Sequence, residues 1–180
     1  MKNSVISEKA VIGRNVQIGF FCIIEEGAEI GDDVVIENYC IIRSGVKIGS
    51  GTKLKSYIEL RERTIIGENC FVDSKVSSSG DCQVGNNVTL RYETILARGL
   101  KISDNCYLSP RVMTNNLDDE MKSIGGAHIG KNCFIGTNAV LQHGIVIGEN
   151  VTIGSMAFVN KDCEDNLVYV GIPAKSLKGR

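Results

Sequence analysis

An aliphatic residue recurs at every sixth position through most of the sequence. From Ile6 to Leu108 each sixth residue is isoleucine, leucine or valine, with the single exception of Ser78. The period stops near Thr114 and resumes in a shifted phase at Ile129. Because the side chains of an α-helix repeat with a much shorter period, this pattern does not fit amphipathic helices and requires another regular structure.

A second set of mostly small or β-branched residues lies two positions before the aliphatic ones, as at Ala10, Val16 and Ala28. Side chains of a strand alternate between its two faces. Two inward residues two positions apart, followed by a gap of four, therefore describe a short strand and then a corner. The 20 glycines and the abundant valine and isoleucine favour such short strands with tight turns. Each six-residue unit is one side of a coil.

Corner sequences of one kind recur once in every three of these six-residue sides, so the coil is triangular. Eight of them predict an all-β solenoid of about eight coils. They are IGRNV (12–16), IGDDV (30–34), IGSGT (48–52), IGENC (66–70), VGNNV (84–88), ISDNC (102–106), IGKNC (129–133) and IGENV (147–151).

This pattern resembles that of the hexapeptide-repeat acyltransferases over residues 4–174. The resemblance implies a left-handed parallel β-helix, usually assembled as a homotrimer, with coenzyme A carrying the acyl group and no metal. We expect a single domain over 1–180. Within it, coils span 4–114, a loop excursion spans 115–126, the final coils span 127–163 and a C-terminal tail spans 164–180.

The charges are balanced, with 20 basic and 21 acidic residues spread along the chain. This distribution gives no electrostatic footprint for nucleic acid or an anionic membrane. No apolar stretch approaches the roughly 20 residues of a membrane span, and the N-terminus lacks the apolar region of a signal peptide. We therefore expect a cytoplasmic protein whose partners are small molecules.

The cysteines all occupy the small inward position two residues before an aliphatic one. We expect reduced thiols packed in the core, because a free cysteine behaves as a small buried hydrophobe and no zinc-type spacing is present. Cys22 and Cys40 lie one coil apart and should stack, so they are the one pair to inspect for a disulfide bond. The seven are Cys22, Cys40, Cys70, Cys82, Cys106, Cys133 and Cys163.

The third residue after the corner aliphatic is asparagine, aspartate or glycine in all eight corners. These residues tolerate a left-handed backbone conformation, so Asn87 is expected to hold a corner in shape. The preceding position, occupied by Asn86, is a polar mixture with no evident backbone requirement. Asn86 is either a surface residue or free to do chemistry.

Two segments resemble a narrower group, the N-acetyltransferases that modify amino groups on nucleotide-linked deoxysugars. They are VGNNVTLRYETI, which starts at Val84, and NCYLSPRVMTNN (105–116). The resemblance implies that Asn86, in the turn, and Asn116, before the loop, line the active site.

The corner spacing grows from 18 to 27 between Ile102 and Ile129, so extra residues enter after Thr114. A loop that leaves a solenoid is a natural place for a binding element. In the family such a loop reaches a groove between subunits. Asp118 could orient a substrate amine or hydroxyl there, and the alternative is a solvated acidic loop.

Many O-acetyltransferases of this fold carry a catalytic histidine at or just beyond the position where this sequence has Asn115 and Asn116. No histidine occupies that position here. A sugar hydroxyl needs a general base to attack a thioester, whereas a deprotonated amine has a lone pair. The missing histidine therefore favours an amine acceptor. His143 is the alternative base, because it should lie one coil beyond Asn116, with Arg98 one coil before and able to bind a phosphate or carboxylate.

The tail sequence VYVGIPAK (168–175) resembles the family ending that lies beside coenzyme A. The resemblance places Gly144, Lys161, Ile172 and Lys175 at the cofactor, with Lys178 and Arg180 also available to its phosphates. The tail should also cap the last coil.

The leading hypothesis is an acyl-coenzyme A dependent N-acyltransferase acting on a nucleotide-linked amino-deoxysugar. The first alternative is an O-acetyltransferase of a sugar or small alcohol that uses His143. The second is a non-enzymatic β-helix scaffold, since fold does not imply function. Zinc enzymes with three histidine ligands are excluded because the sequence has two histidines.

Overall fold

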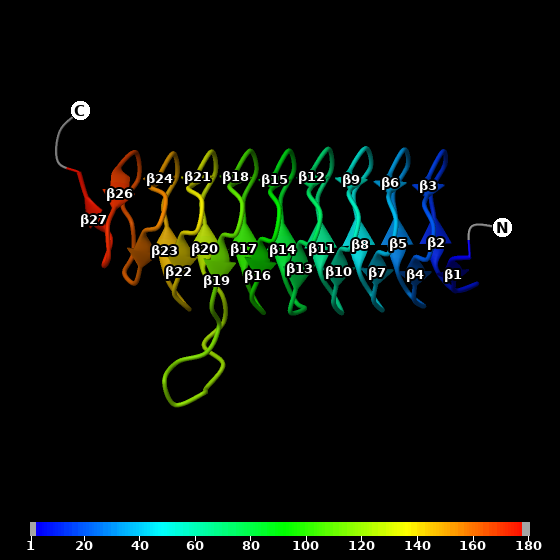
Figure 1. Cartoon of the computed structure of the whole chain (residues 1–180), viewed down its shortest axis with the longest axis horizontal. Helices are drawn as coiled ribbons and strands as arrows, with labels where there is room; N and C mark the ends of the chain where they lie inside the picture. The colour runs from blue at the N-terminus through cyan, green and yellow to red at the C-terminus, as the bar shows by residue number, and fades with distance from the viewer. Residues whose placement is uncertain (1–2, 178–180) are drawn as a thin grey trace.

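The chain winds into one straight column of short strands, as Figure 1 shows. The structure is a computed structural model that describes residues 3–177. Within that range it contains strands and turns and no helix, so no helix could span a membrane. The predicted all-β parallel solenoid is confirmed, with about nine turns in place of eight. The difference arises because the sequence prediction counted corners of one kind, and only one of the three kinds of corner in each turn was used.

Three parallel sheets form the sides of the column, and we name them in the order in which the chain meets them. Sheet A contains β1 (Val5–Ile6), β4 (Ile23–Ile24), β7 (Ile41–Ile42), β10 (Glu59–Leu60), β13 (Ser77–Ser78), β16 (Ile95–Leu96), β19 (Met113–Thr114), β22 (Val140–Leu141) and β25 (Phe158–Val159). Sheet B contains β2 (Val11–Ile12), β5 (Glu29–Ile30), β8 (Lys47–Ile48), β11 (Ile65–Ile66), β14 (Gln83–Val84), β17 (Lys101–Ile102), β20 (His128–Ile129) and β23 (Val146–Ile147).

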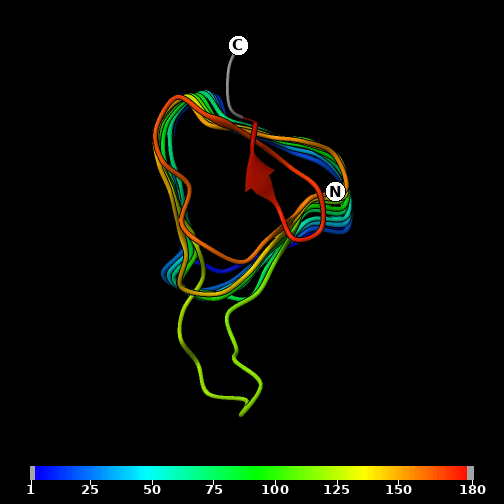
Figure 2. The same cartoon turned by 90° about the vertical axis from the view of Figure 1, so that its left-hand side faces the viewer.

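Sheet C contains β3 (Gln17–Ile18), β6 (Val35–Ile36), β9 (Lys53–Leu54), β12 (Phe71–Val72), β15 (Thr89–Leu90), β18 (Tyr107–Leu108), β21 (Phe134–Ile135), β24 (Thr152–Ile153), β26 (Val168–Val170) and β27 (Lys175–Ser176). The corners that join the sheets are called AB, BC and CA below. Viewed down the column, the coils superimpose as a triangle from which one loop projects (Figure 2).

The six-residue period marks the core, because the second residue of nearly every strand points into the column. Leu54, Leu90 and Ile135 are fully buried, as are the small residues two positions earlier. The first coil differs: Ile6 and Ile12 remain 43% and 37% exposed, since among the described residues no coil lies on their outer side. Burial is therefore a property of stacking and not of the single coil.

The corners take the left-handed conformation that the sequence predicts. Asn87 has a φ of 55°, and the equivalent residues of the other BC corners are alike. The CA corners have the same left-handed backbone, but some of them carry bulky aromatic residues that rarely adopt it. Phe21, Tyr39 and Tyr57 have φ of 56°, 58° and 63°. Their rings stack with centroids 5.2 Å and 4.9 Å apart, which offsets part of the conformational cost of a bulky residue there.

The seven cysteines are buried and free, as predicted. Cys22 and Cys40 form no disulfide bond, and Cys106 and Cys133, which the sequence analysis did not pair, are also neighbours. The excursion lies between these two in the sequence and adds no coil to the column, so their strands β18 and β21 pair directly. The hydrogen bond to Cys133 and burial both raise the pKa of Cys106.

We expect these thiols to be inert toward a thiol reagent in the native protein. Burial raises the pKa of Cys82 to about 11 and that of Cys40 to about 12, so the reactive thiolate is scarce at neutral pH. Titration with a chromogenic disulfide should find no fast-reacting thiol before unfolding and all seven in denaturant. A fast-reacting thiol in the folded protein would contradict this packing.

The end of the described chain covers the last coil. Strand β26 continues sheet C beside β24, and β27 turns back antiparallel to β26. The turn between them crosses toward sheet A, where the Phe158 amide donates to the Gly171 carbonyl (3.0 Å) and the Ala174 amide donates to the Phe158 carbonyl (2.8 Å). The described part of the column thus ends in a fold-back that covers the last coil.

Candidate functional site

The excursion leaves the column at the AB corner that follows β19. The Asn115 amide donates to the Leu141 carbonyl (3.0 Å), which keeps the chain in register with the next coil. The Asn116 carbonyl then accepts the amides of Ile124 (2.8 Å) and Gly125 (3.3 Å), so the neck of the loop is closed. Since Thr114 pairs with Leu141, Asn116 and His143 occupy equivalent positions on successive coils, as predicted.

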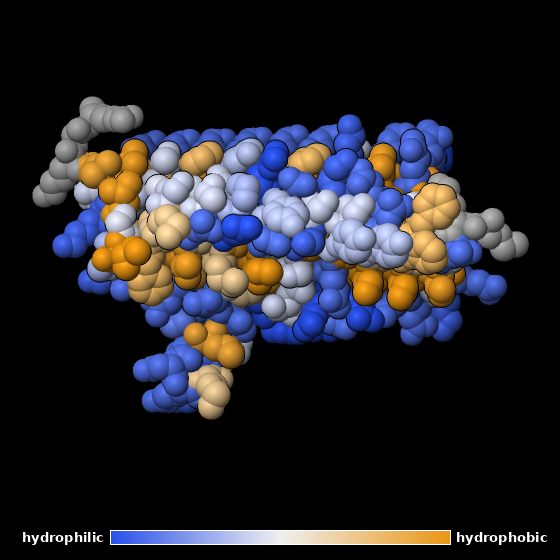
Figure 3. Space-filling model, in the orientation of Figure 1, coloured by the Kyte–Doolittle hydropathy of each residue, from blue (hydrophilic) through white to orange (hydrophobic). Residues whose placement is uncertain are grey.

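The loop itself is an ordered arm. Leu117 and Ser123 form an antiparallel bridge across it. One carboxylate oxygen of Asp118 accepts the amides of Glu120 (3.0 Å) and Lys122 (2.8 Å), so Asp118 shapes the turn. Figure 3 shows the arm standing clear of the column, with hydrophobic residues among polar ones. The exposed apolar side chains on it are Leu117, Met121 and Ile124.

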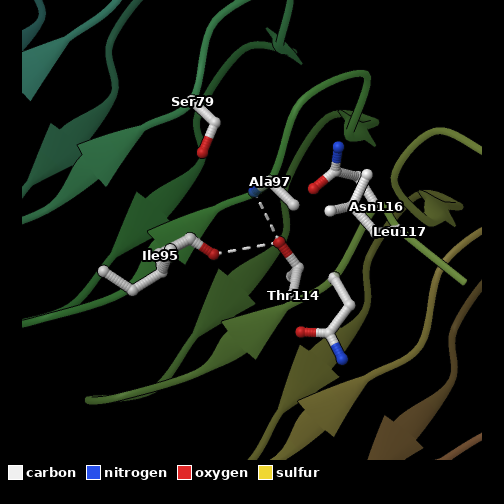
Figure 4. Close-up of a pocket in the computed structure, with 7 residues that line it drawn as sticks. Ser79, Ile95, Ala97, Thr114, Asn116 and Leu117 are labelled. Carbon is white, nitrogen blue, oxygen red and sulfur yellow. Dashed lines mark hydrogen bonds between the residues drawn. The ribbon is translucent and has the colours of Figure 1, made fainter. Parts of the chain in front are cut away.

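A shallow pocket of about 200 Å³ lies where the arm joins the column (Figure 4). Its polar groups are neutral: two hydroxyls and two side-chain amides. No charged side chain lines it, so it suits a neutral, hydroxylated group better than a phosphate. The lining residues are Ser79, Ile95, Ala97, Thr114, Asn115, Asn116 and Leu117.

Small residues create this pocket. Ser79 and Ala97 are the first residues of two successive AB corners, where other coils carry the larger Arg43 or Gln142. The sequence analysis missed both. The available signal was the run of small residues SSSG followed one coil later by LARG, at positions where the neighbouring corners are bulky.

Arg98 lies at this corner and is held by a carboxylate. Its guanidinium forms an ion pair with Asp81, which also pairs with Arg63 at 2.6 Å. The hydrogen bond from Arg63 lowers the pKa of Asp81 below its usual range. Arg98 is thus positioned beside the pocket, and its predicted phosphate or carboxylate ligand would compete with Asp81.

His143 is half-buried on the next coil, and its Nε2 lies 3.3 Å from the Gln142 side-chain amide. Within residues 3–177 the ring forms no ion pair with a carboxylate. The other histidine, His128, is exposed at the start of β20.

Asn86 lies at a BC corner, where the strands of sheet B end, whereas the excursion leaves from an AB corner, where those strands begin. Its side-chain oxygen accepts the Glu68 amide (2.8 Å), and its own backbone amide donates to Asp104 Oδ1 (2.8 Å). Asp32 and Asp165 cap the preceding coil in the same way. The Asn86 side chain is therefore not free, although the position has no shared requirement, since Arg14 and Lys131 occupy it in other coils without a side-chain acceptor.

The residues predicted for the cofactor fall in two places. Gly144 and Lys161 continue the AB corner beyond Asn116, and Ile124 of the arm packs over Gly144, which has no side chain to block it. Ile172 and Lys175 are exposed on the terminal fold-back. Lys178 and Arg180 lie outside the described residues.

Metal ligands are not gathered anywhere in the described chain: residues 3–177 contain no group of three or more histidine, cysteine, aspartate or glutamate side chains placed to hold an ion. The AB corner with its arm, pocket and neighbouring Arg98 and His143 is thus the best-defined candidate site.

Two family models together match almost the whole column. The model of the GMPPB C-terminal domain matches residues 1–118. The chain belongs to this family. The bacterial transferase hexapeptide model, a unit of six repeats, matches residues 126–161, on the other side of the excursion. The predicted hexapeptide repeat is confirmed. A comparison with curated proteins finds no match to the sequence.

Solved structures share the fold over nearly the full chain. LpxA from Acinetobacter baumannii has a TM-score of 0.78 at 19% identity, covering 98% of this chain and 72% of LpxA. The UDP-N-acetylglucosamine O-acyltransferase of Moraxella catarrhalis has a TM-score of 0.73 at 21% identity, covering 98% and 73%. AntD, an N-acyltransferase from Bacillus cereus in complex with dTDP and coenzyme A, has a TM-score of 0.51 at 19% identity, covering 95% and 83%. This likeness confirms the left-handed parallel β-helix.

Proposed function

We propose that this protein is an acyl-coenzyme A dependent N-acyltransferase that acylates the amino group of a nucleotide-linked amino-deoxysugar. The observation that carries the proposal is the neutral pocket at the AB corner, with the amide of Asn116 at its edge and no carboxylate-paired histidine among the described residues. A neutral pocket of hydroxyls and amides suits a sugar ring, and a site without a strong base suits an amine. AntD, which shares the fold, is an N-acyltransferase seen with dTDP and coenzyme A.

The chemistry needs few groups. The unprotonated amine attacks the thioester carbonyl, a C–N bond forms and the C–S bond breaks, so coenzyme A leaves as the thiol after taking a proton. The proton comes from the attacking nitrogen, through His143 or water. The Asn116 amide donates to the oxyanion of the tetrahedral intermediate, and Lys161 and Lys175 are the proposed ligands of the coenzyme A phosphates.

Asn86 joins this site only if two copies of the chain assemble. It lies two coils before Asn116 and at the opposite edge of sheet B, on the order of 15–20 Å away along a six-residue side. One amino group cannot contact both residues of the same chain. A trimer with the site between neighbouring columns would bring Asn86 of one copy to Asn116 of the next.

Two other functions remain candidates. O-acyl transfer is favoured by the placement of His143 one coil from Asn116. The Moraxella catarrhalis relative is an O-acyltransferase that is also called LpxA, the name of the Acinetobacter baumannii relative. A non-enzymatic β-helix scaffold is the other candidate, since the fold by itself does not imply a reaction.

Coenzyme A release separates these functions. The purified protein is incubated with acetyl-coenzyme A and a panel of 3-amino and 4-amino nucleotide sugars beside their hydroxyl counterparts. We expect release only with amino sugars. Release with hydroxyl sugars that is lost in His143→Ala would establish the O-acyl reaction. If no acyl donor gives coenzyme A release with any sugar, and calorimetry detects no coenzyme A binding, the scaffold function is supported.

A further inference from the structure

The first residue of each AB corner normally donates its backbone amide to a backbone carbonyl of the next coil. The Glu25 amide donates to the Ile42 carbonyl (2.9 Å), the Arg43 amide to the Leu60 carbonyl (3.0 Å) and the Ser79 amide to the Leu96 carbonyl (2.8 Å). These bonds continue the sheet ladder into the corner and hold successive corners in line.

Two coils replace this bond with a side-chain hydroxyl. The Arg61 amide donates to Ser78 Oγ (2.9 Å), and the Ala97 amide donates to Thr114 Oγ1 (2.7 Å). Both hydroxyls are buried in sheet A at positions where the six-residue period otherwise places an aliphatic side chain. The hydroxyls are therefore the physical reason for two interruptions of the period.

The two hydroxyls differ in the strand pairing around them. Ser78 keeps full pairing, since both residues of β13 pair with β10. At Thr114 only Met113 of β19 still pairs with Ile95 of β16. The Thr114 hydroxyl donates back to the Ile95 carbonyl (3.0 Å) and so spans the gap where pairing has ended, as Figure 4 shows.

We infer that the Thr114 hydroxyl is the positioning group that turns the chain out of the column and sets Asn115 and Asn116 against the pocket. With the Ala97 amide satisfied by a side chain, the backbone after Thr114 is released from the ladder behind it. It is then held by the Asn115 bond to Leu141 ahead and by the closed neck at Asn116. The arm therefore leaves the column at a fixed point and angle.

This inference rests on the proposed function for its effect on catalysis, but its structural part stands alone. The test compares Thr114→Val, which keeps the shape and loses the hydroxyl, with Thr114→Ser, which keeps the hydroxyl. Ser78→Ala is the matched control, because it removes a buried bond to a corner amide two coils away from the arm, together with the 2.7 Å bond between the Ser78 and Thr64 hydroxyls.

Amide hydrogen exchange is the first readout. Loss of one hydrogen bond should speed exchange of the Ala97 amide by about tenfold in Thr114→Val, with faster exchange across residues 115–126. Thr114→Ser should restore the native pattern, and Ser78→Ala should leave 115–126 unchanged. Equal exchange in the arm for Thr114→Val and the native protein would overturn the inference.

Acyl transfer is the second readout. We expect kcat with the amino-sugar acceptor to fall about tenfold to a hundredfold in Thr114→Val, because a displaced site group loses its alignment. The KM for acetyl-coenzyme A should not change, and Ser78→Ala should keep native kcat. Equal losses of kcat in Thr114→Val and Ser78→Ala would mean that the Thr114 hydroxyl only stabilises the core and does not position the site. If the native protein transfers no acyl group, the proposed function fails and the exchange result alone decides the inference.

Discussion

Replacing Asn116 by aspartate should lower kcat by about 10² to 10³, the typical effect of removing one donor to a developing oxyanion. The change keeps the shape of the side chain, replaces its N–H donors by a carboxylate and repels the oxyanion. In the described part of the chain the Asn116 side chain forms no hydrogen bond, and only its carbonyl holds the loop neck. The thermal unfolding midpoint should therefore stay within about a degree or two of the native value.

The matched control is Asn138→Asp, which makes the same chemical change at a CA corner, where aspartate tolerates the φ of 57°. Initial rates with the amino-sugar acceptor and saturating acetyl-coenzyme A measure the effect. Native kcat in Asn116→Asp would remove Asn116 from the reaction. A loss in Asn138→Asp as well would mean that added charge anywhere is harmful, and would leave the active site unassigned.

Gly67→Ala should be among the most destabilising single substitutions in the column, by about 3 kcal/mol or more. A Cβ at Gly67 would lie 2.4 Å from the Gly85 carbonyl oxygen and 2.5 Å from its carbon. Both atoms belong to the backbone of the next coil, so the clash can be relieved only by separating two coils. The same close approach recurs along the BC corners, which is why nearly every corner sequence begins with an aliphatic residue and glycine.

Gly27→Ala is the matched control for that substitution. Gly27 has a φ of 71°, and its nearest neighbour for a Cβ is 3.7 Å away. It should therefore cost only the left-handed conformation of a non-glycine residue, about 1 kcal/mol. Chemical denaturation followed by circular dichroism gives both values. Equal costs at the two sites would show that the coils can separate far enough to admit a Cβ at Gly67, and that contact between coils does not dictate glycine there.

The sequence by itself determined the fold, because in a solenoid the neighbours of each residue are set by the repeat. An aliphatic residue such as Leu54 contacts its equivalents one coil before and after, so a regular period of six predicts burial, strand position and corner without knowledge of distant contacts. The left-handed backbone of Asn87 followed for the same reason, since its corner recurs with residues of one conformational class.

The sequence was less informative where one coil differs from the next. Cys106 and Cys133 are neighbours because the residues of the excursion lie outside the column, so the coils before and after it pair directly. Counting residues in steps of 18 does not reveal this. Asn86 carries a backbone cap that several residue types can supply, so its position showed no shared chemistry in the sequence. The pocket likewise depends on small side chains in two successive coils, and their proximity to the arm becomes visible only in the folded column.

The period already predicted that Asn116 and His143 lie on successive coils at one corner. Only the tertiary structure decided what the site residues contact, because the partners of Asn86, such as the Glu68 amide and Asp104, belong to adjacent coils. The Thr114 hydroxyl shows the same principle at one bond, since its partner is the amide of Ala97 in the preceding coil. The period fixes what repeats, and function depends on contacts between coils where the repeat is broken.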